Sequence, residues 1–310
     1  MTARHLAVPA RAAVPARPRG YRGATGVSAC FGTFGELVQG VLPGAGGDFL
    51  VTLPIARWTV ATFQLDPGAG GVQVHPRHKV KAQRITEMLL ELLGGPAGGV
   101  LTIESSLPEG KGLASSSADL VAAARAVGNA LGADLPPDRI EHLLRQIEPT
   151  DGVLYPGIVA FDHRAVRLRT HLGSLPTMTI IGLDEGGMVD TIAFNQLDRP
   201  FSAADRREYR VLLERMADAV ARRDLATAGA IATRSAELNQ TLSPKRTLAA
   251  VLDICRDIGA LGVVATHSGT MLGLLLDVHD PDYLAKVAAG IHGCARLSDD
   301  VALYRSLTFD

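Results

Sequence analysis

A glycine- and serine-rich segment at residues 108–118, with the sequence PEGKGLASSSA, constrains the fold of this chain more than any other. Two glycines permit a tight turn close to an anion, three serine hydroxyls follow, and the Ala-rich apolar run over 118–131 predicts a helix. The start of such a helix offers unpaired backbone N–H groups and the positive end of the helix dipole, which together suit a polyphosphate. The alternative is an ordinary Gly-Ser loop with a serine N-cap.

Other phosphate-binding and nucleophile motifs are missing from the sequence. It contains no Gly-x-x-x-x-Gly-Lys-Ser/Thr segment, which argues against a P-loop fold. It also contains no Gly-x-Ser-x-Gly elbow and no Ser-x-x-Lys motif, which weakens a serine-hydrolase interpretation.

The segment resembles the Pro-x-x-x-Gly-Leu-x-Ser-Ser-x-Ala signature of the GHMP small-molecule kinases, the superfamily of galactokinase, homoserine kinase and mevalonate kinase. Residues 30–40, CFGTFGELVQG, are similar to the first motif of that family, and residues 267–273, HSGTMLG, are similar to its third, glycine-bearing motif. The sequences of four segments most resemble those of the L-threonine kinases that feed cobalamin side-chain synthesis. These segments are GELVQG, EPTDG at 148–152, VDT and FN within 189–195, and HSGT.

Strand patterns dominate the first half of the chain and helix patterns the second, with strands returning late, which predicts an α+β fold with two lobes. The resemblance implies the two-lobed GHMP kinase fold, with a mixed sheet-and-helix N-terminal lobe, a C-terminal lobe of antiparallel sheet plus helices, and a cleft between them. We expect a flexible Ala/Pro/Arg-rich tail at residues 1–24, the N-terminal lobe at 25–168 and the C-terminal lobe at 169–310. Strands are expected at 27–31, 37–41, 49–53, 57–63, 100–104, 157–161, 166–168, 178–183, 263–266, 271–276 and 301–304, and helices at 79–93, 118–131, 136–147, 203–222, 225–242, 247–260 and 283–291.

Composition excludes several classes of partner. The net charge is −1, so no global basic field attracts nucleic acid or an anionic membrane, and the densest basic segment is the amino tail. No run of about 18 apolar residues predicts a membrane span, and the first twenty residues lack the apolar core of a secretory signal. Three scattered cysteines favour the reducing cytoplasm. The expected partner is a small-molecule substrate, and a homodimer is left open.

The resemblance implies ATP and Mg²⁺ as cofactors and assigns the nucleotide to the glycine-rich segment. Lys111 is expected to act in catalysis as a cation beside the phosphates, although a solvated lysine is the alternative. Ser116 is the serine expected to meet Mg²⁺, and Glu148 is the preferred carboxylate ligand, with Glu141 in reserve. The expected nucleotide-binding residues are Pro108, Gly110, Lys111, Gly112, Leu113, Ala114, Ser115, Ser116 and Ser117.

Asp151 is the expected catalytic base. It lies in Pro-Thr-Asp-Gly, a turn-forming setting that would hold a short carboxylate rigidly, and the resemblance implies that this aspartate accepts or orients the acceptor hydroxyl. An ordinary turn aspartate is the alternative.

An amino-acid acceptor needs groups that pair with its ammonium and carboxylate, because a buried unpaired charge is costly. For Glu36, a carboxylate bound to backbone N–H groups is the structural alternative, and for His267 a packed histidine at a strand end. The candidates are Glu36, Gln39, Asp190, Thr191, Asn195, His267, Ser268, Gly269 and Thr270.

These features predict an ATP-dependent kinase that acts on the hydroxyl of a small polar metabolite. L-threonine, giving O-phospho-L-threonine, is the leading acceptor. The alternatives are homoserine, serine or another amino-acid-like intermediate, or a ligand sensor that keeps the fold without catalysis.

Overall fold

The computed structural model describes residues 23–189, 194, 197 and 200–309. The predicted tail therefore lies outside the described residues except for its last two positions, and Asp190, Thr191 and Asn195 also lie outside them. Among the helices that are described, none is long and apolar enough to cross a membrane.

A long antiparallel hairpin joins the two halves of the molecule. It consists of β1 (Thr25–Val41) and β2 (Asp48–Leu65), connected by a single 3₁₀ turn, η1 (Gly44–Gly46). Four short strands were expected here, but each pair is one continuous strand. The pairing is interrupted between Phe31 and Val38 by shifts in register, and Gly35 takes a positive φ of 53° within them. Such bulges bend a strand without ending it, which is why glycines that indicate a turn in the sequence lie inside β1.

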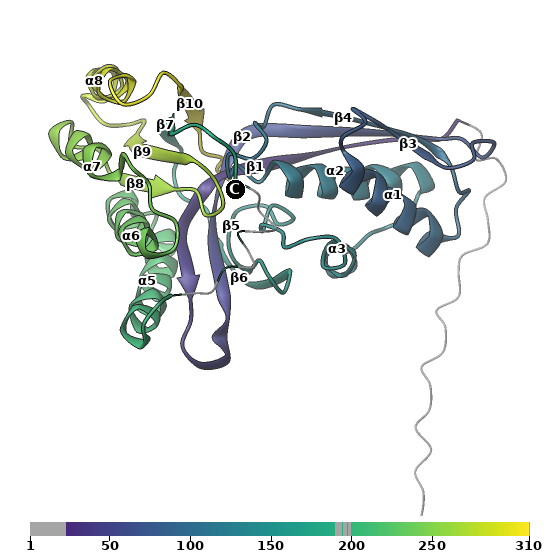
Figure 1. Cartoon of the computed structure of the whole chain (residues 1–310), viewed down its shortest axis with the longest axis horizontal. Coiled ribbons are helices and arrows are strands. Elements are labelled where there is room, and N and C mark those ends of the chain that lie inside the picture. The colour runs from purple at the N-terminus through teal and green to yellow at the C-terminus, as the bar shows by residue number, and fades with distance from the viewer. Residues whose placement is uncertain (1–22, 190–193, 195–196, 198–199, 310) are drawn as a thin grey trace, which may run out of the picture.

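Ten strands of the described chain form one sheet, in the order β10-β7-β9-β8-β1-β2-β4-β3, with β5 paired to β2 and β6 paired to β5 (Figure 1). The sequence did not predict β3, whose four residues pair in parallel with β4. The remaining strands are β3 (Val72–His75), β4 (Gly99–Ser105), β5 (Ile158–Asp162), β6 (Arg167–Gly173), β7 (Met178–Asp184), β8 (Gly262–Ala265), β9 (Met271–Asp277) and β10 (Val301–Arg305).

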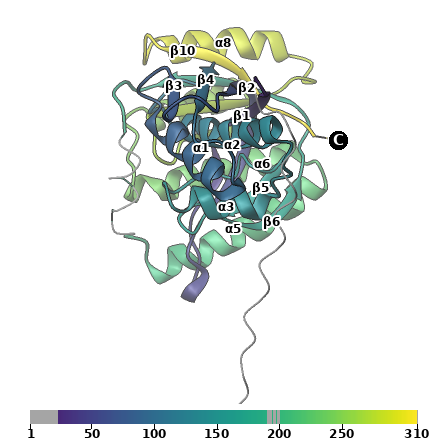
Figure 2. The same cartoon turned by 90° about the vertical axis from the view of Figure 1, so that its right-hand side faces the viewer.

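The helices whose bounds the structure describes divide into two groups along the hairpin. One group lies with β3 and β4 on the right of Figure 1, and the other lies with β7 to β10 on the left. Figure 2 looks from the side of the first group. This arrangement confirms the predicted two-lobed α+β fold, and the boundary at residues 168 and 169 stays a prediction. The first group is α1 (Val80–Leu93), α2 (Ser115–Leu131) and α3 (Pro137–Leu144); the second is α5 (Ala203–Ala221), α6 (Leu225–Leu238), α7 (Leu248–Asp257) and α8 (Tyr283–Ala295), with a 3₁₀ turn η2 (Asn239–Thr241) after α6.

Helix α2 is the buried centre of the first group and begins earlier than predicted. Its N-cap is Ala114, which adopts the left-handed conformation with φ 58°, so the three serines lie in the first helical turn. The helix packs against β1 so closely that a Cβ on Gly26 would lie 2.0 Å from the carbonyl oxygen of Ala126. The glycine-rich segment thus ends in a helix start that the sheet holds in place.

Candidate functional site

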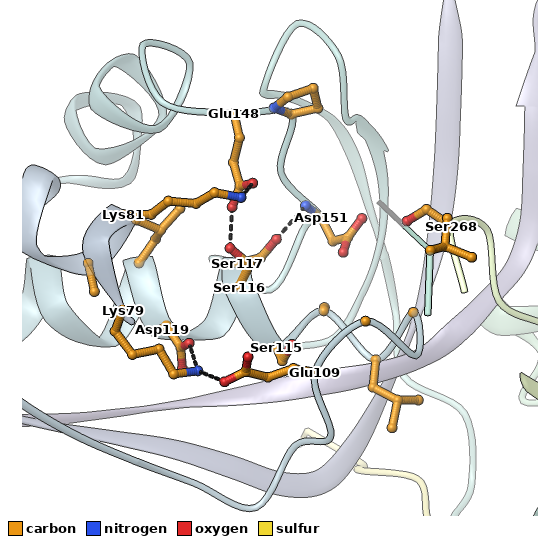
Figure 3. A pocket seen from close by; sticks show the side chains of 18 of the residues that line it. Lys79, Lys81, Glu109, Ser115, Ser116, Ser117, Asp119, Glu148, Asp151 and Ser268 are labelled. Atoms are coloured by element: carbon orange, nitrogen blue, oxygen red, sulfur yellow. Dashed lines mark hydrogen bonds and ion pairs between the residues drawn. The ribbon is translucent and has the colours of Figure 1, made fainter. Parts of the chain in front are cut away.

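A cleft of about 290 Å³ lies at the N-terminus of α2 (Figure 3). Five segments that are far apart in the sequence contribute to its walls: residues 78–82, 109–120, 148–151, 188–189 and 267–268, with His163 added from the loop after β5. Most of the glycine-rich segment, Glu148 and Asp151 therefore face one shared space.

The first turn of α2 forms the floor of the cleft. Ser115, Ser116 and Ser117 all line it, and the N-cap residue Ala114 offers no side-chain acceptor for their backbone N–H groups. The first N–H that finds a partner within the helix is that of Ala118, which donates to the Ala114 carbonyl at 2.9 Å. A helix start with free N–H groups and a positive dipole end is suited to a phosphate.

Glu148 lies against this turn and binds two groups. Its Oε1 accepts a hydrogen bond from the Ser116 hydroxyl, and its Oε2 forms an ion pair with the ammonium of Lys81 (Figure 3). The Glu148 side chain is 3% exposed. A hydroxyl and a carboxylate at the edge of a phosphate site are oxygen ligands of the kind that Mg²⁺ prefers.

The reserve metal ligand, Glu141, does not reach the cleft. Its Oε1 accepts hydrogen bonds from the Tyr155 hydroxyl at 2.9 Å and from the Leu168 N–H at 2.8 Å. This carboxylate ties α3 to β6, so the structure corrects the assignment of Glu141 as an alternative ligand.

Asp151 is held at the cleft by its backbone, whose N–H donates to Ser117 Oγ at 3.1 Å. Burial, and then the negative charge of Glu148, raise the pKa of the Asp151 carboxyl from 3.8 to about 6. A carboxyl with such a pKa is ionised at neutral pH and is a stronger base than an ordinary aspartate.

Two lysines that the sequence analysis did not single out line the cleft, Lys79 and Lys81. Lys79 bridges Asp119 of α2, at 2.6 Å, and Glu109 of the glycine-rich segment, at 2.5 Å. These two ion pairs outweigh burial and raise the pKa of the Lys79 ammonium. Two basic residues at the start of a predicted helix were the available signal, but nothing in the sequence places that helix beside α2.

Some of the expected acceptor residues, Glu36, Gln39, His267 and Ser268, form a second group near Asp151. Glu36 is buried, and burial followed by the charge of Asp151 raises the pKa of its carboxyl well above 4.5. Gln39 donates to the Ala265 carbonyl at 3.0 Å and pairs through Oε1 with His267 Nδ1 at 2.9 Å. Of this group, His267 and Ser268 line the cleft itself.

Lys245 is a further residue that the sequence analysis missed. Its ammonium is buried beside the third motif and donates to the Gly269 carbonyl at 2.5 Å. Burial lowers the pKa of this lysine, although the charges of Glu185 and Glu36 oppose the shift.

Lys111 differs from its expected position. Its ammonium forms an ion pair with Asp184 and donates to the Gly187 carbonyl at 2.8 Å, and Lys111 is not among the residues that line the cleft. Thr270, expected to bind the acceptor, donates its hydroxyl to the same aspartate.

Comparisons with known proteins concern the family and the fold. Residues 80–155 match the family model "GHMP kinases N terminal domain", and residues 216–292 match "GHMP kinases C terminal". Two curated proteins named L-threonine kinase, from Citrobacter freundii and Salmonella typhimurium, are each 27% identical to the chain; the alignments cover 83% and 81% of this chain and 89% and 83% of those proteins. The crystal structure of a homoserine kinase from Cytophaga hutchinsonii superposes with a TM-score of 0.68 at 17% identity, covering 91% of this chain and 95% of that one.

Proposed function

We propose that this chain phosphorylates the hydroxyl of L-threonine to give O-phospho-L-threonine. The chain belongs to the GHMP kinases and is an ATP-dependent small-molecule kinase. The observation that carries the catalytic part of the proposal is the single cleft in which Asp151 faces the first turn of α2. The names of the two curated relatives support threonine as the acceptor. In the pathway that the sequence resemblance implies, the product would feed cobalamin side-chain synthesis in the cytoplasm.

The first turn of α2 would receive the terminal phosphates of ATP. Ser115, Ser116 and Ser117 line this space without a side-chain cap for their N–H groups, and Lys79 and Lys81 line it as well. Fixed donors of this kind stabilise the charge that develops on the transferred phosphoryl group.

Glu148 and Ser116 would hold Mg²⁺, because they provide a buried carboxylate and a hydroxyl side by side. A bound Mg²⁺ would neutralise phosphate charge. Without it, Lys81 balances the charge of Glu148.

Asp151 would accept the hydroxyl proton of the acceptor. As the threonine oxygen forms its bond to the γ-phosphorus, the bond from that phosphorus to the oxygen of the ADP leaving group breaks, and the proton moves to the Asp151 carboxylate. A pKa of about 6 keeps this carboxylate ionised at neutral pH.

Glu36 would pair with the acceptor ammonium. Its carboxyl is buried beside Asp151, and in the part of the chain that the structure describes its Oε2 receives no hydrogen bond. A substrate ammonium would supply the missing donor and charge. The roles of Asp190, Thr191 and Asn195 in acceptor binding stay predictions.

The test measures ADP release with L-threonine, L-homoserine, L-serine and D-threonine at equal concentration, and identifies the product by ³¹P NMR. We expect L-threonine to give the highest kcat/KM, and Asp151→Asn to abolish its stimulation while nucleotide binding is kept. Release of ADP with homoserine or serine but not with threonine would contradict the proposal that L-threonine is the acceptor. Tight nucleotide binding without turnover of any acceptor would favour the alternative of a ligand sensor that keeps the fold without catalysis.

A further inference from the structure

Asp184 stands at the end of β7, outside the cleft, with both of its oxygens engaged. One oxygen forms the ion pair with Lys111, and the other accepts hydrogen bonds from the Thr270 hydroxyl and, at 3.0 Å, from the Gly186 N–H. The Asp184 side chain is only 3% exposed. Burial alone would raise the pKa of this carboxyl, but the donors from Lys111, Thr270 and Gly186 outweigh it and lower the pKa.

The two side-chain partners of this carboxylate belong to two of the segments that contribute to the walls of the cleft. Lys111 lies in the phosphate loop, which we define as residues 108–114, and Thr270 lies in the glycine loop, which we define as residues 266–270. Because β7 belongs to neither loop, Asp184 is a third element that holds both.

The two loops also touch through their backbones, and there is no spare room between them. A Cβ on Gly269 would lie 2.1 Å from the Lys111 carbonyl oxygen and 2.5 Å from the Gly112 nitrogen. On its other side, the Gly269 carbonyl accepts the hydrogen bond from Lys245. Any movement of the glycine loop is therefore passed to the phosphate loop.

We propose that Asp184 is a positioning residue for phosphoryl transfer. It holds Lys111 and Thr270 together, sets the distance between the phosphate loop and the glycine loop, and so fixes where the first turn of α2 presents its N–H groups. Lys111 acts through Asp184 instead of through the phosphates. Displacement of reacting groups by about 1 Å can cost on the order of 10²-fold in rate, so a clamp outside the cleft can govern turnover. The inference depends on nucleotide binding at α2 and not on threonine as the acceptor.

Three variants test the clamp: Asp184→Asn, Lys111→Met and the double variant. Asparagine keeps an oxygen for Thr270 and Gly186 and loses only the charge that Lys111 needs. Lys111 is the less buried partner, with 20% of its side chain exposed, so Lys111→Met keeps the test open if Asp184→Asn folds poorly. The dissociation constant of a non-hydrolysable ATP analogue is measured by calorimetry, with KM for ATP and kcat measured separately.

We expect each single variant to weaken analogue binding roughly tenfold, and the double variant to be no weaker than the worse single, because both changes break one interaction. Asp280→Asn is the matched control, since it breaks the Lys286–Asp280 ion pair of 2.7 Å at the start of α8, and it should leave binding unchanged.

Two results would overturn the inference while leaving the nucleotide site in place. If Lys111 touched the phosphates directly, Lys111→Met would be far more harmful than Asp184→Asn and the two losses would add. If Asp184 served stability alone, Asp184→Asn would lower the melting temperature and leave the dissociation constant, KM and kcat unchanged. Failure of the unaltered protein to bind the analogue would instead contradict the nucleotide site itself, and the clamp with it.

Discussion

Replacing Asp151 with asparagine should make this protein more stable and almost inactive. The carboxylate lies at the cleft near Glu148, and within the described chain no side chain or N–H donates a hydrogen bond to it. The backbone N–H of Asp151, which donates to Ser117, is unaffected by the change. Asparagine has nearly the same shape, so the variant removes a charge and leaves the local packing intact.

The magnitude follows from the pKa of the carboxyl. Burial and the charge of Glu148 raise the pKa of Asp151 from 3.8 to about 6. One pKa unit corresponds to about 1.4 kcal/mol, so the full shift corresponds to about 3 kcal/mol of folding free energy lost when the group is ionised. Asp151 is partly exposed to the cleft, where water screens its charge, and we therefore expect a gain of about 1–2 kcal/mol in the variant.

The pH dependence gives the sign of the effect. Because the folded-state pKa of Asp151 is raised, its contribution to stability is present below about pH 4 and is lost as the pH rises through about 6. The advantage of Asp151→Asn over the unaltered protein should therefore be near zero at pH 4, grow between pH 4 and 6, and stay constant above that. At pH 7, where the Asp151 carboxylate of the unaltered protein is ionised, the turnover of the variant should be lower by about 10²–10⁴-fold.

Urea unfolding at several pH values between 4 and 8 measures the free energy of unfolding of both proteins. Glu141→Gln is the matched control, because its carboxylate accepts hydrogen bonds from Tyr155 and from the backbone of Leu168. That variant should lose about 1 kcal/mol. If Asp151→Asn were no more stable than the unaltered protein at pH 8, or if its gain did not change with pH, the electrostatic reasoning about this cleft would be wrong.

Three further predictions concern the same cleft. The kcat/KM of the unaltered protein should fall about tenfold per pH unit below pH 6, as Asp151 is protonated; a flat profile would exclude it as the base. Glu148→Gln should raise the Mg²⁺ concentration for half-maximal activity by on the order of tenfold, and an unchanged requirement would remove Glu148 from the metal site. Gly269→Ala should cost about 1–3 kcal/mol of stability and raise KM for ATP, because the new Cβ would overlap the backbone of Lys111. Gly71→Ala is the control, because a Cβ on Gly71 would meet no atom within 4 Å. Equal effects of the two variants would contradict the close contact at Gly269.

The parts of the site that the sequence predicts are the local ones. The strand, turn and helix around the glycine-rich segment follow one another along the chain, so hydrophobic periodicity and glycine placement find them. The start of α2 was misplaced by three residues for a specific reason. Sequence rules look for Ser, Thr, Asp or Asn at the N-cap, whereas here Ala114 caps the helix in the left-handed conformation and the serines lie inside it.

The long strands are harder to predict because a glycine in the sequence can indicate either a turn or a bulge within a strand. In the sequence, Gly35 indicates a turn. In the structure, it lies inside β1 with a positive φ, in a bulge where the backbone approaches Ala265 of β8. A Cβ there would lie 2.6 Å from the Ala265 carbonyl oxygen. Only the pairing of β1 with a strand more than 200 residues later distinguishes a bulge from a turn.

No local sequence pattern determines which carboxylate a lysine side chain contacts. Lys111 is part of the phosphate loop yet reaches Asp184, while Lys79 and Lys81, about 35 residues before α2, line the cleft. A lysine is a mobile point charge on a flexible stem, so it turns toward whichever carboxylate the fold brings within reach. In the proposed nucleotide site the lysines that line the cleft therefore come from the start of α1, although each is paired to a carboxylate, whereas the lysine inside the motif pairs with Asp184.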